Sequence, residues 1–313
     1  MTKTLLATAA AAATLAAAPA HAAQSQRVVF ESNGDRLVGD LFLPDDFEAG
    51  DKLPAVVVTG AWTTVKEQMP ARYAAEMADR GYAALAFDFR GWGQSEGEPR
   101  QLEDPERKTE DIVAAAEYLA ARPEVDADRL AGLGICASSG YMADAAARSP
   151  RIGSLALVAP WLHNAEIVEA TYGGAETVEN LIATGRKAEG KGEMIEAASA
   201  TNEDSLMYQA PYYVDAERGA IPEWDNRFNL ASWEPWLTYD AVKLSGDINA
   251  AGVPVTIVHS EAAAIPGGAH SFFDALDVRK EELWLDDVGQ MDFYDRDDAV
   301  TEAADRVAAF LKG

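Results

Sequence analysis

The chain has 313 residues, with 26 basic against 52 acidic side chains and a formal net charge of −26 at pH 7. A surface this acidic repels nucleic acid and anionic membranes, so we expect neither as a partner. One cysteine and four histidines exclude an intrachain disulfide and a cysteine-rich zinc site.

The first 22 residues have the three parts of a secretory signal peptide. Lys3 lies in a short polar start, an alanine- and leucine-rich stretch follows, and Ala20-His21-Ala22 matches a cleavage site. The apolar stretch is too short and too rich in alanine for a convincing transmembrane helix. We therefore expect cleavage after Ala22, a periplasmic or secreted protein, and one mature domain over residues 23–313.

Strand and helix signals alternate along the mature chain. An Asn33-Gly34 turn between apolar stretches predicts a β-hairpin at the start. Six later apolar stretches have the length of buried strands: 53–60, 82–89, 129–135, 152–160, 253–260 and 282–287. Five segments have helical periodicity: 65–81, 103–121, 137–147, about 268–276, and 299–311. This alternation predicts an α/β fold with a mostly parallel central sheet and helices on both faces.

The alternation breaks between about residues 161 and 247. This segment is helix-prone over 175–198 and then rich in aromatic residues. We expect it to form a cap over the carboxyl ends of the strands, where ligands bind in folds of this kind. Its Trp and Tyr side chains suit an apolar or ring-containing ligand, although packing within the cap is the simpler use for them.

The segment GLGICASSGY (132–141) places the only cysteine, Cys136, between a predicted strand and a predicted helix. A nucleophile at such a bend needs small residues two positions before and two positions after it. Around Cys136 these positions hold Gly134 and Ser138, and both are small. If Ser138 were the nucleophile instead, the position two residues before it would hold Cys136, which fits poorly. We also expect the adjacent helix N-terminus to lower the pKa of the thiol from about 8.5 and to favour a thiolate.

Four motifs together resemble α/β hydrolases of the dienelactone-hydrolase-like branch, near bacterial exported hydrolases related to X-prolyl peptidases. They are GAWTTVKEQ (60–68), FDFRGWGQSEGEPR (87–100), GICASSGY (134–141) and GQMDFYD (289–295). The resemblance covers nearly the whole mature chain and implies an α/β-hydrolase fold, with a cysteine nucleophile of the kind that dienelactone hydrolases use. An oxyanion hole would then be formed by the backbone N–H of Ala137 and that of Ala61 or Trp62.

Two members of the family's catalytic triad are replaced in this chain. Gln290 stands where relatives carry the catalytic histidine, and the position aligned with the family's acid is Ala263, two residues after Glu261. Glutamine has no titrating proton acceptor, so it cannot act as a general base. Glu261 is the first candidate to replace the base, and His259 and His163 are further candidates.

We therefore predict an atypical hydrolase or acyl-transfer enzyme that acts on a small ester, thioester or lactone through Cys136, with Gln290 as a polar positioning residue. A small-molecule substrate is the only expected partner, and no metal or organic cofactor is implied. Two alternatives stay open: a ligand-binding pseudohydrolase without turnover, and a lyase or isomerase on the same fold. Nothing in the sequence sets the oligomeric state.

Overall fold

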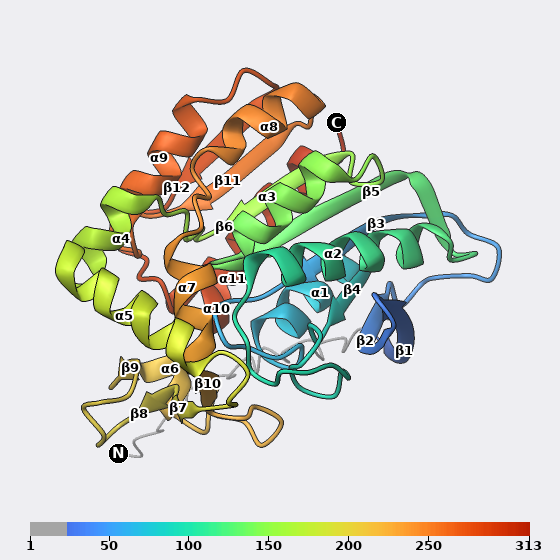
Figure 1. Cartoon of the computed structure of the whole chain (residues 1–313). Coiled ribbons are helices and arrows are strands. Elements are labelled where there is room, and N and C mark those ends of the chain that lie inside the picture. The colour runs from blue at the N-terminus through green and yellow to red at the C-terminus, as the bar shows by residue number, and fades with distance from the viewer. Residues whose placement is uncertain (1–23) are drawn as a thin grey trace, which may run out of the picture.

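A computed structural model describes residues 24–313, so the predicted signal peptide at residues 1–22 lies outside the described residues. An eight-stranded sheet in the order β1-β2-β4-β3-β5-β6-β11-β12 forms the centre of the molecule (Figure 1). β1 (Gln24–Ser32) and β2 (Asp35–Leu43) are the antiparallel hairpin that the Asn33-Gly34 turn predicts. Both turn residues have positive φ, 49° for Asn33 and 87° for Gly34, as a tight hairpin turn requires.

β2 pairs with β4 in an antiparallel arrangement, and every later pair in this sheet is parallel. The remaining strands are β3 (Leu53–Thr59), β4 (Ala83–Phe87), β5 (Val125–Ile135), β6 (Ser154–Val158), β11 (Val255–His259) and β12 (Lys280–Trp284). β4 and β11 are buried along their whole length, which explains their unbroken apolar sequences. The predicted mostly parallel sheet is confirmed.

Helices cover both faces of the sheet (Figure 1). The larger ones are α1 (Met69–Asp79), α2 (Pro105–Ala120), α3 (Ser138–Arg148), α8 (Leu244–Ala251), α9 (Pro266–Asp274) and α11 (Asp297–Leu311), and the short α10 (Asp292–Asp295) precedes the last. α2, α3 and α8 pack side by side on one face, while α1 and α11 contact each other on the opposite face. The helix predicted from residue 65 begins only at Met69, because the preceding residues form a loop tied to buried side chains.

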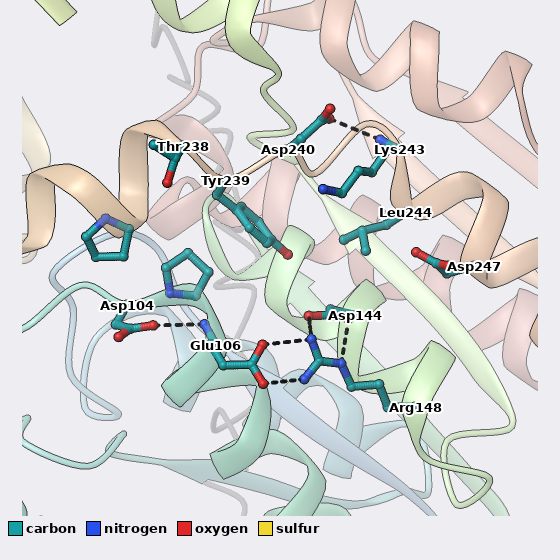
Figure 2. Close-up of a pocket in the computed structure, with 12 residues that line it drawn as sticks. Asp104, Glu106, Asp144, Arg148, Thr238, Tyr239, Asp240, Lys243, Leu244 and Asp247 are labelled. Carbon is teal, nitrogen blue, oxygen red and sulfur yellow. Dashed lines mark hydrogen bonds and ion pairs between the residues drawn. The ribbon is translucent and has the colours of Figure 1, made fainter. Parts of the chain in front are cut away.

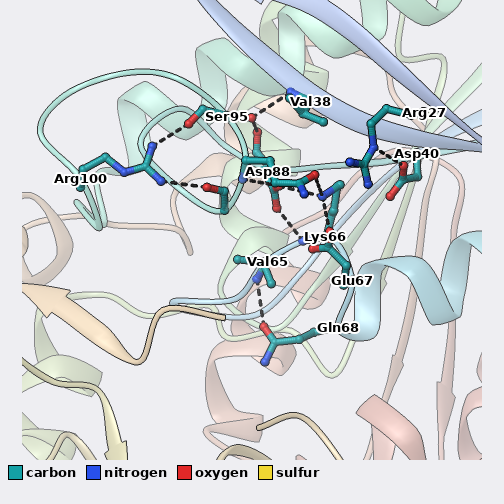
Figure 3. A network of polar contacts seen from close by, with 12 residues as sticks. Arg27, Val38, Asp40, Val65, Lys66, Glu67, Gln68, Asp88, Ser95 and Arg100 are labelled. Carbon is teal, nitrogen blue, oxygen red and sulfur yellow. Dashed lines mark hydrogen bonds and ion pairs between the residues drawn. The ribbon is translucent and has the colours of Figure 1, made fainter. Parts of the chain in front are cut away.

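Figure 3 shows the contacts that hold this loop. The Lys66 Nζ lies 3.0 Å from Asp88 Oδ2, and both side chains are fully buried. The Lys66 backbone N–H donates to Asp88 Oδ1 at 2.8 Å, and the Gln94 N–H donates to Asp88 Oδ2 at 2.9 Å. The Ser95 hydroxyl donates to the Asp88 carbonyl at 2.6 Å and accepts from the Val38 N–H. The motifs GAWTTVKEQ and FDFRGWGQSEG are therefore joined through one buried carboxylate.

The segment between β6 and α8 forms a group of small elements on one side of the sheet (Figure 1). They are α4 (Ala165–Thr171), α5 (Ala175–Ala188), β7 (Met194–Glu196), β8 (Ala198–Ser199), β9 (Met207–Tyr208), α6 (Pro211–Val214), β10 (Arg227–Asn229), η1 (Leu230–Ser232) and α7 (Trp233–Leu237). The helix expected over 175–198 ends at Ala188, two residues before Gly190, whose φ of 68° is incompatible with a helix. We call residues 165–237 the cap segment.

Candidate active site

Cys136 lies at the bend between β5, which ends at Ile135, and α3, which begins at Ser138. Its φ of 57° is in the left-handed region, a strained conformation for a residue with a Cβ. A Cβ at Gly134 would lie 2.8 Å from the Ser138 carbonyl oxygen, so the bend needs glycine there. The Ser138 hydroxyl donates to the Ile135 carbonyl at 3.1 Å and accepts from the Ile135 N–H at 3.2 Å. Ser138 is thus bonded to the backbone of the bend, and Cys136 is the residue at its tip.

A cavity of about 450 Å³ lies between Cys136 and the cap segment. Its walls are mainly aromatic and include Trp62, Trp161, Tyr172, Tyr213, Trp233 and Trp236. Trp62 packs against the cap segment, with its ring centroid 4.8 Å from that of Phe228 and 5.4 Å from that of Trp236. Among the described residues, none of those that line the cavity has a charged side chain. The cavity is therefore apolar although the chain as a whole is strongly acidic.

Two backbone N–H groups converge on the Cys136 sulfur. One belongs to Ala137, next to the start of α3, and the other to Trp62, in the loop after β3. Of the two residues that the sequence offered for this loop, Ala61 points its carbonyl to the Thr64 hydroxyl at 2.6 Å, and Trp62 supplies the N–H at the sulfur. Two N–H donors in this arrangement are what a developing oxyanion needs.

A buried carboxylate fixes the loop that carries Trp62. The Thr63 N–H donates to Glu103 Oε2 at 3.1 Å, and the Trp224 indole donates to the Thr63 carbonyl at 2.8 Å. Glu103 Oε1 in turn accepts from Lys108 Nζ at 2.6 Å and from the Tyr141 hydroxyl at 2.9 Å. Because both polar backbone groups of Thr63 have fixed partners, the adjacent Trp62 peptide is held in place.

The expectation of a lowered thiol pKa is wrong. Burial raises the pKa of Cys136 above its ordinary value, and the hydrogen bonds to the sulfur offset this only in part. The charged thiolate loses more by leaving water than it gains from the donors at the start of α3. The site therefore holds a neutral thiol at neutral pH.

Gln290 joins three separate parts of the site. Its Nε2 donates to the Ala159 carbonyl at 2.9 Å and to the Tyr294 hydroxyl at 3.2 Å. Its Oε1 accepts from the Ala264 N–H at 3.0 Å. The side chain also lies close enough to the Cys136 sulfur to lower the pKa of the thiol slightly. The amide thus connects the end of β6, the loop after β11 and the start of α10 around the thiol.

Glu261 does not reach the thiol, contrary to the expectation that it replaces the base. Its side chain is 71% exposed and its carboxylate lies 2.8 Å from His270 Nε2 on α9. The loop after β11 turns back over Ser260, which accepts from the N–H of Ala262 and of Ala263, and this turn directs Glu261 to the surface. Ala263, the position aligned with the family's acid, is buried and offers no carboxylate.

The two other candidate bases are also placed elsewhere. His163 Nε2 lies 3.0 Å from the Trp236 carbonyl, and its Nδ1 accepts from the Trp161 indole at 3.0 Å. His259 is fully buried and stacks on Trp284, with ring centroids 5.2 Å apart. Burial lowers the pKa of each histidine to about 4. Both are therefore neutral at pH 7, and neither lines the cavity.

Sequence reasoning missed Tyr294, whose hydroxyl hydrogen-bonds both the Cys136 sulfur and Gln290. It lies in α10 and lines the cavity. The spacing of four residues from Gln290, about one helical turn, was a signal for the contact between these two side chains. Nothing in the sequence paired Tyr294 with Cys136.

A second hollow, shown in Figure 2, is polar and is lined by none of the residues around the thiol. In it Arg148 forms ion pairs with Glu106 at 2.6 Å and with Asp144 at 2.7 Å. Over residues 24–313 there is no group of three or more His, Cys, Asp or Glu side chains that could hold a metal ion. Within the same residues, every helix is too short or too polar to cross a membrane.

Comparison with known proteins shows which family the chain resembles. The family described as X-Pro dipeptidyl-peptidase (S15 family) matches residues 33–289. PA2218 of Pseudomonas aeruginosa is 29% identical over 306 residues, covering 92% of this chain and 80% of the relative. Its crystal structure has a TM-score of 0.78 at 26% identity and covers 94% of both chains.

Two fungal proteins extend the comparison. The α/β hydrolase GrgF from a Penicillium species has a TM-score of 0.75 at 23% identity, with 92% of this chain and 98% of that chain covered. At this identity the likeness shows the fold alone, and the fold is the expected α/β-hydrolase fold. The thiohydrolase aneE of Aspergillus aculeatus is 33% identical over 120 residues, which cover 38% of this chain and 36% of the relative.

Proposed function

The chain belongs to the X-Pro dipeptidyl-peptidase (S15) family of hydrolases, and from that premise we propose that it transfers acyl groups through Cys136. The substrate is a small, uncharged ester, thioester or lactone. The observation that carries the proposal is the convergence of the Ala137 and Trp62 N–H groups on a sulfur that faces an apolar cavity. The nucleophile is then of the kind that dienelactone hydrolases use.

The reaction has two steps. The Cys136 sulfur forms a bond to the substrate carbonyl carbon, and the carbonyl oxygen takes up negative charge beside the N–H groups of Ala137 and Trp62. The leaving thiol or alcohol departs with a proton, and an acyl-cysteine remains. Water then releases an acid, or an alcohol, thiol or amine takes the acyl group.

The absence of a titrating base favours thioesters among the possible substrates. Exchange of a thiol with a thioester replaces one C–S bond with another of similar strength, and a free thiol such as that of cysteine ionises at about pH 8.5, so the leaving thiolate is a weak base. Acylation by an ester depends more on protonation of the leaving group, because the leaving alkoxide is a much stronger base than a thiolate. We therefore propose that thioesters acylate the site fastest.

The lining of the cavity argues against the activity in the family's name. The N-terminus of a peptide carries a positive charge, and burying such a charge costs several kcal/mol unless an opposite charge pairs with it. Within residues 24–313, those that line the cavity include no carboxylate. The apolar rings instead suit an aryl or aliphatic acyl group.

The proposal is tested by mixing the protein with the phenylacetyl thioester of N-acetylcysteamine and measuring the mass of the intact chain after one turnover. We expect a phenylacetyl adduct in the wild type and in Ser138→Ala, whose hydroxyl bonds only the backbone of the bend, and none in Cys136→Ala. An adduct that persists in Cys136→Ala would show a different nucleophile. Bound, unchanged thioester without an adduct would favour the alternative of a ligand-binding protein without turnover, to which the raised pKa of the thiol also points.

A further inference from the structure

Tyr294 occupies the position next to the sulfur from which a proton could be exchanged. Its hydroxyl contacts the Cys136 sulfur and accepts from Gln290 Nε2 at 3.2 Å. Tyr213, in the wall of the same cavity, is a further neighbour of this hydroxyl. A phenol has one proton to donate and two lone pairs that accept. The Tyr294 oxygen can therefore take one proton while it gives up another.

The orientation of the Gln290 amide sets the direction of this hydrogen bond. Because Oε1 of Gln290 accepts from the Ala264 N–H at 3.0 Å, its NH2 group is the part that faces Tyr294. Gln290 then donates to the Tyr294 oxygen and leaves the phenolic proton free to point elsewhere. The Cys136 sulfur is one of its two remaining neighbours.

Two of the side chains that the sequence offered as bases are at the surface or already engaged. Glu261 is at the surface with His270, and both ring nitrogens of His163 are bonded, one to the Trp161 indole and one to the Trp236 carbonyl. Burial keeps the pKa of Tyr294 well above its ordinary value, so the phenol is neutral at pH 7. A neutral group that both donates and accepts can move a proton without acting as a charged base.

We propose that Tyr294 is a further catalytic residue, which relays the proton between Cys136 and the leaving or attacking group; this rests on the proposed acyl transfer. During acylation the sulfur forms the C–S bond, and the thiol proton passes to the Tyr294 oxygen. The phenolic proton passes to the leaving sulfur or oxygen, which takes the electron pair of the bond that breaks. During deacylation the attacking water, alcohol or thiol gives its proton to Tyr294, and the phenolic proton returns to the Cys136 sulfur. Tyr294 is neutral before and after each step.

In this arrangement Gln290 is a positioning residue. Gln290 lies beside the sulfur, but it acts through Tyr294. Its NH2 group donates to the Tyr294 oxygen, so the phenolic proton of Tyr294 points away from Gln290. A relay of this kind explains how a site can keep a nucleophile and an oxyanion hole while glutamine replaces histidine.

Tyr294→Phe tests the relay, because it keeps the ring and removes the hydroxyl. The probes are two phenylacetyl thioesters, one with an alkyl thiol leaving group and one with thiophenol, and the readout is the rate of thiol release in one turnover. With both esters the Cys136 proton must be taken up, but thiophenol leaves as an anion and needs no proton delivered, whereas the alkyl thiolate is a stronger base and does. We expect Tyr294→Phe to slow acylation by the alkyl thioester about 100-fold, since a positioned proton donor typically contributes 10²–10⁴-fold. The thiophenyl ester should lose about tenfold less than the alkyl thioester, because it needs only the first of the two proton transfers.

Tyr239→Phe is the matched control. Tyr239 lies in the polar hollow of Figure 2, and its buried hydroxyl has no hydrogen-bond partner among the described residues. This variant should acylate like the wild type with both esters. In the wild type, the alkyl thioester should also react at least about twofold slower in heavy water, because a proton moves in the step. This second measurement does not depend on any variant folding.

Three outcomes would overturn the relay while acyl transfer by Cys136 stands. They are equal losses of rate with the two esters in Tyr294→Phe, no loss with either ester, and no effect of heavy water on the wild type. A wild type that forms no acyl-cysteine with either ester would overturn the proposed function and the relay together. The two failures are thus distinguished by the wild type alone.

Discussion

Replacing Gln290 with His separates two accounts of this site, a lapsed triad and a built hydrogen-bond network. The Gln290 amide makes three hydrogen bonds to Ala159, Ala264 and Tyr294 with its oxygen and NH2 group. An imidazole has two ring nitrogens and can replace at most two of these bonds. At least one partner is then left unsatisfied, at a cost of about 1–3 kcal/mol. Because Gln290 is only partly buried, we expect the free energy of unfolding to fall by about 1–2 kcal/mol.

Urea unfolding of the wild type and of Gln290→His measures this difference, and release of N-acetylcysteamine from its phenylacetyl thioester measures acylation in the same samples. We expect slower acylation in the variant, because Tyr294 loses the donor that orients it. If Gln290 were only the remnant of a triad, restoring the base would instead speed hydrolysis by about 10²–10⁴-fold. A clear rise in rate with no loss of stability would refute our reasoning. The double variant Gln290→His with Ala263→Asp, which restores both replaced positions, is the control for an imidazole that lacks its acid.

Four further predictions concern the thiol, the buried histidine, the buried ion pair and the N-terminus. Since burial raises the pKa of Cys136, its alkylation by iodoacetamide should keep accelerating with pH beyond 8.5; a plateau below pH 8, or equal labelling of Cys136→Ser, would contradict this. The pKa of His163 is about 4 in the folded chain and about 6.5 when unfolded, so the unfolded state binds more protons between these values and stability falls as pH falls. Between pH 7 and pH 5 this should cost about 2 kcal/mol in urea unfolding, and His163→Gln should lack that part of the loss. Lys66→Met leaves Asp88 buried and unpaired, so it should lower the free energy of unfolding by about 3–5 kcal/mol, and adding Asp88→Asn should recover part of this; a neutral single variant would contradict it. Export with cleavage after Ala22 predicts Ala23 at the mature N-terminus, which N-terminal sequencing of the periplasmic protein would check.

The sequence by itself determined the features that depend on neighbouring residues. The Asn33-Gly34 hairpin, the buried strands and most helices follow from turn chemistry and periodicity, which act over a few residues. The bend at Cys136 follows from a local steric rule, because a side chain at Gly134 would collide with the Ser138 carbonyl. Helix α1 is a partial exception: its first predicted turn is lost, since the Lys66 backbone is bonded to Asp88 on another strand's loop.

Only the tertiary structure decided how the site works. The loop after β3, the start of α3 and α10 are distant along the chain and surround the sulfur of Cys136. Together they bury it, and this burial raises the pKa of the thiol, which α3 was expected to lower. The turn over Ser260 sends Glu261 to the surface, although its position in the sequence suits a base. Packing of α10 against α1 and α11 brings Tyr294 to Cys136, a contact that no spacing could indicate. Desolvation and hydrogen-bond partners depend on the whole set of elements that meet at a point, and periodicity and motifs describe one element at a time.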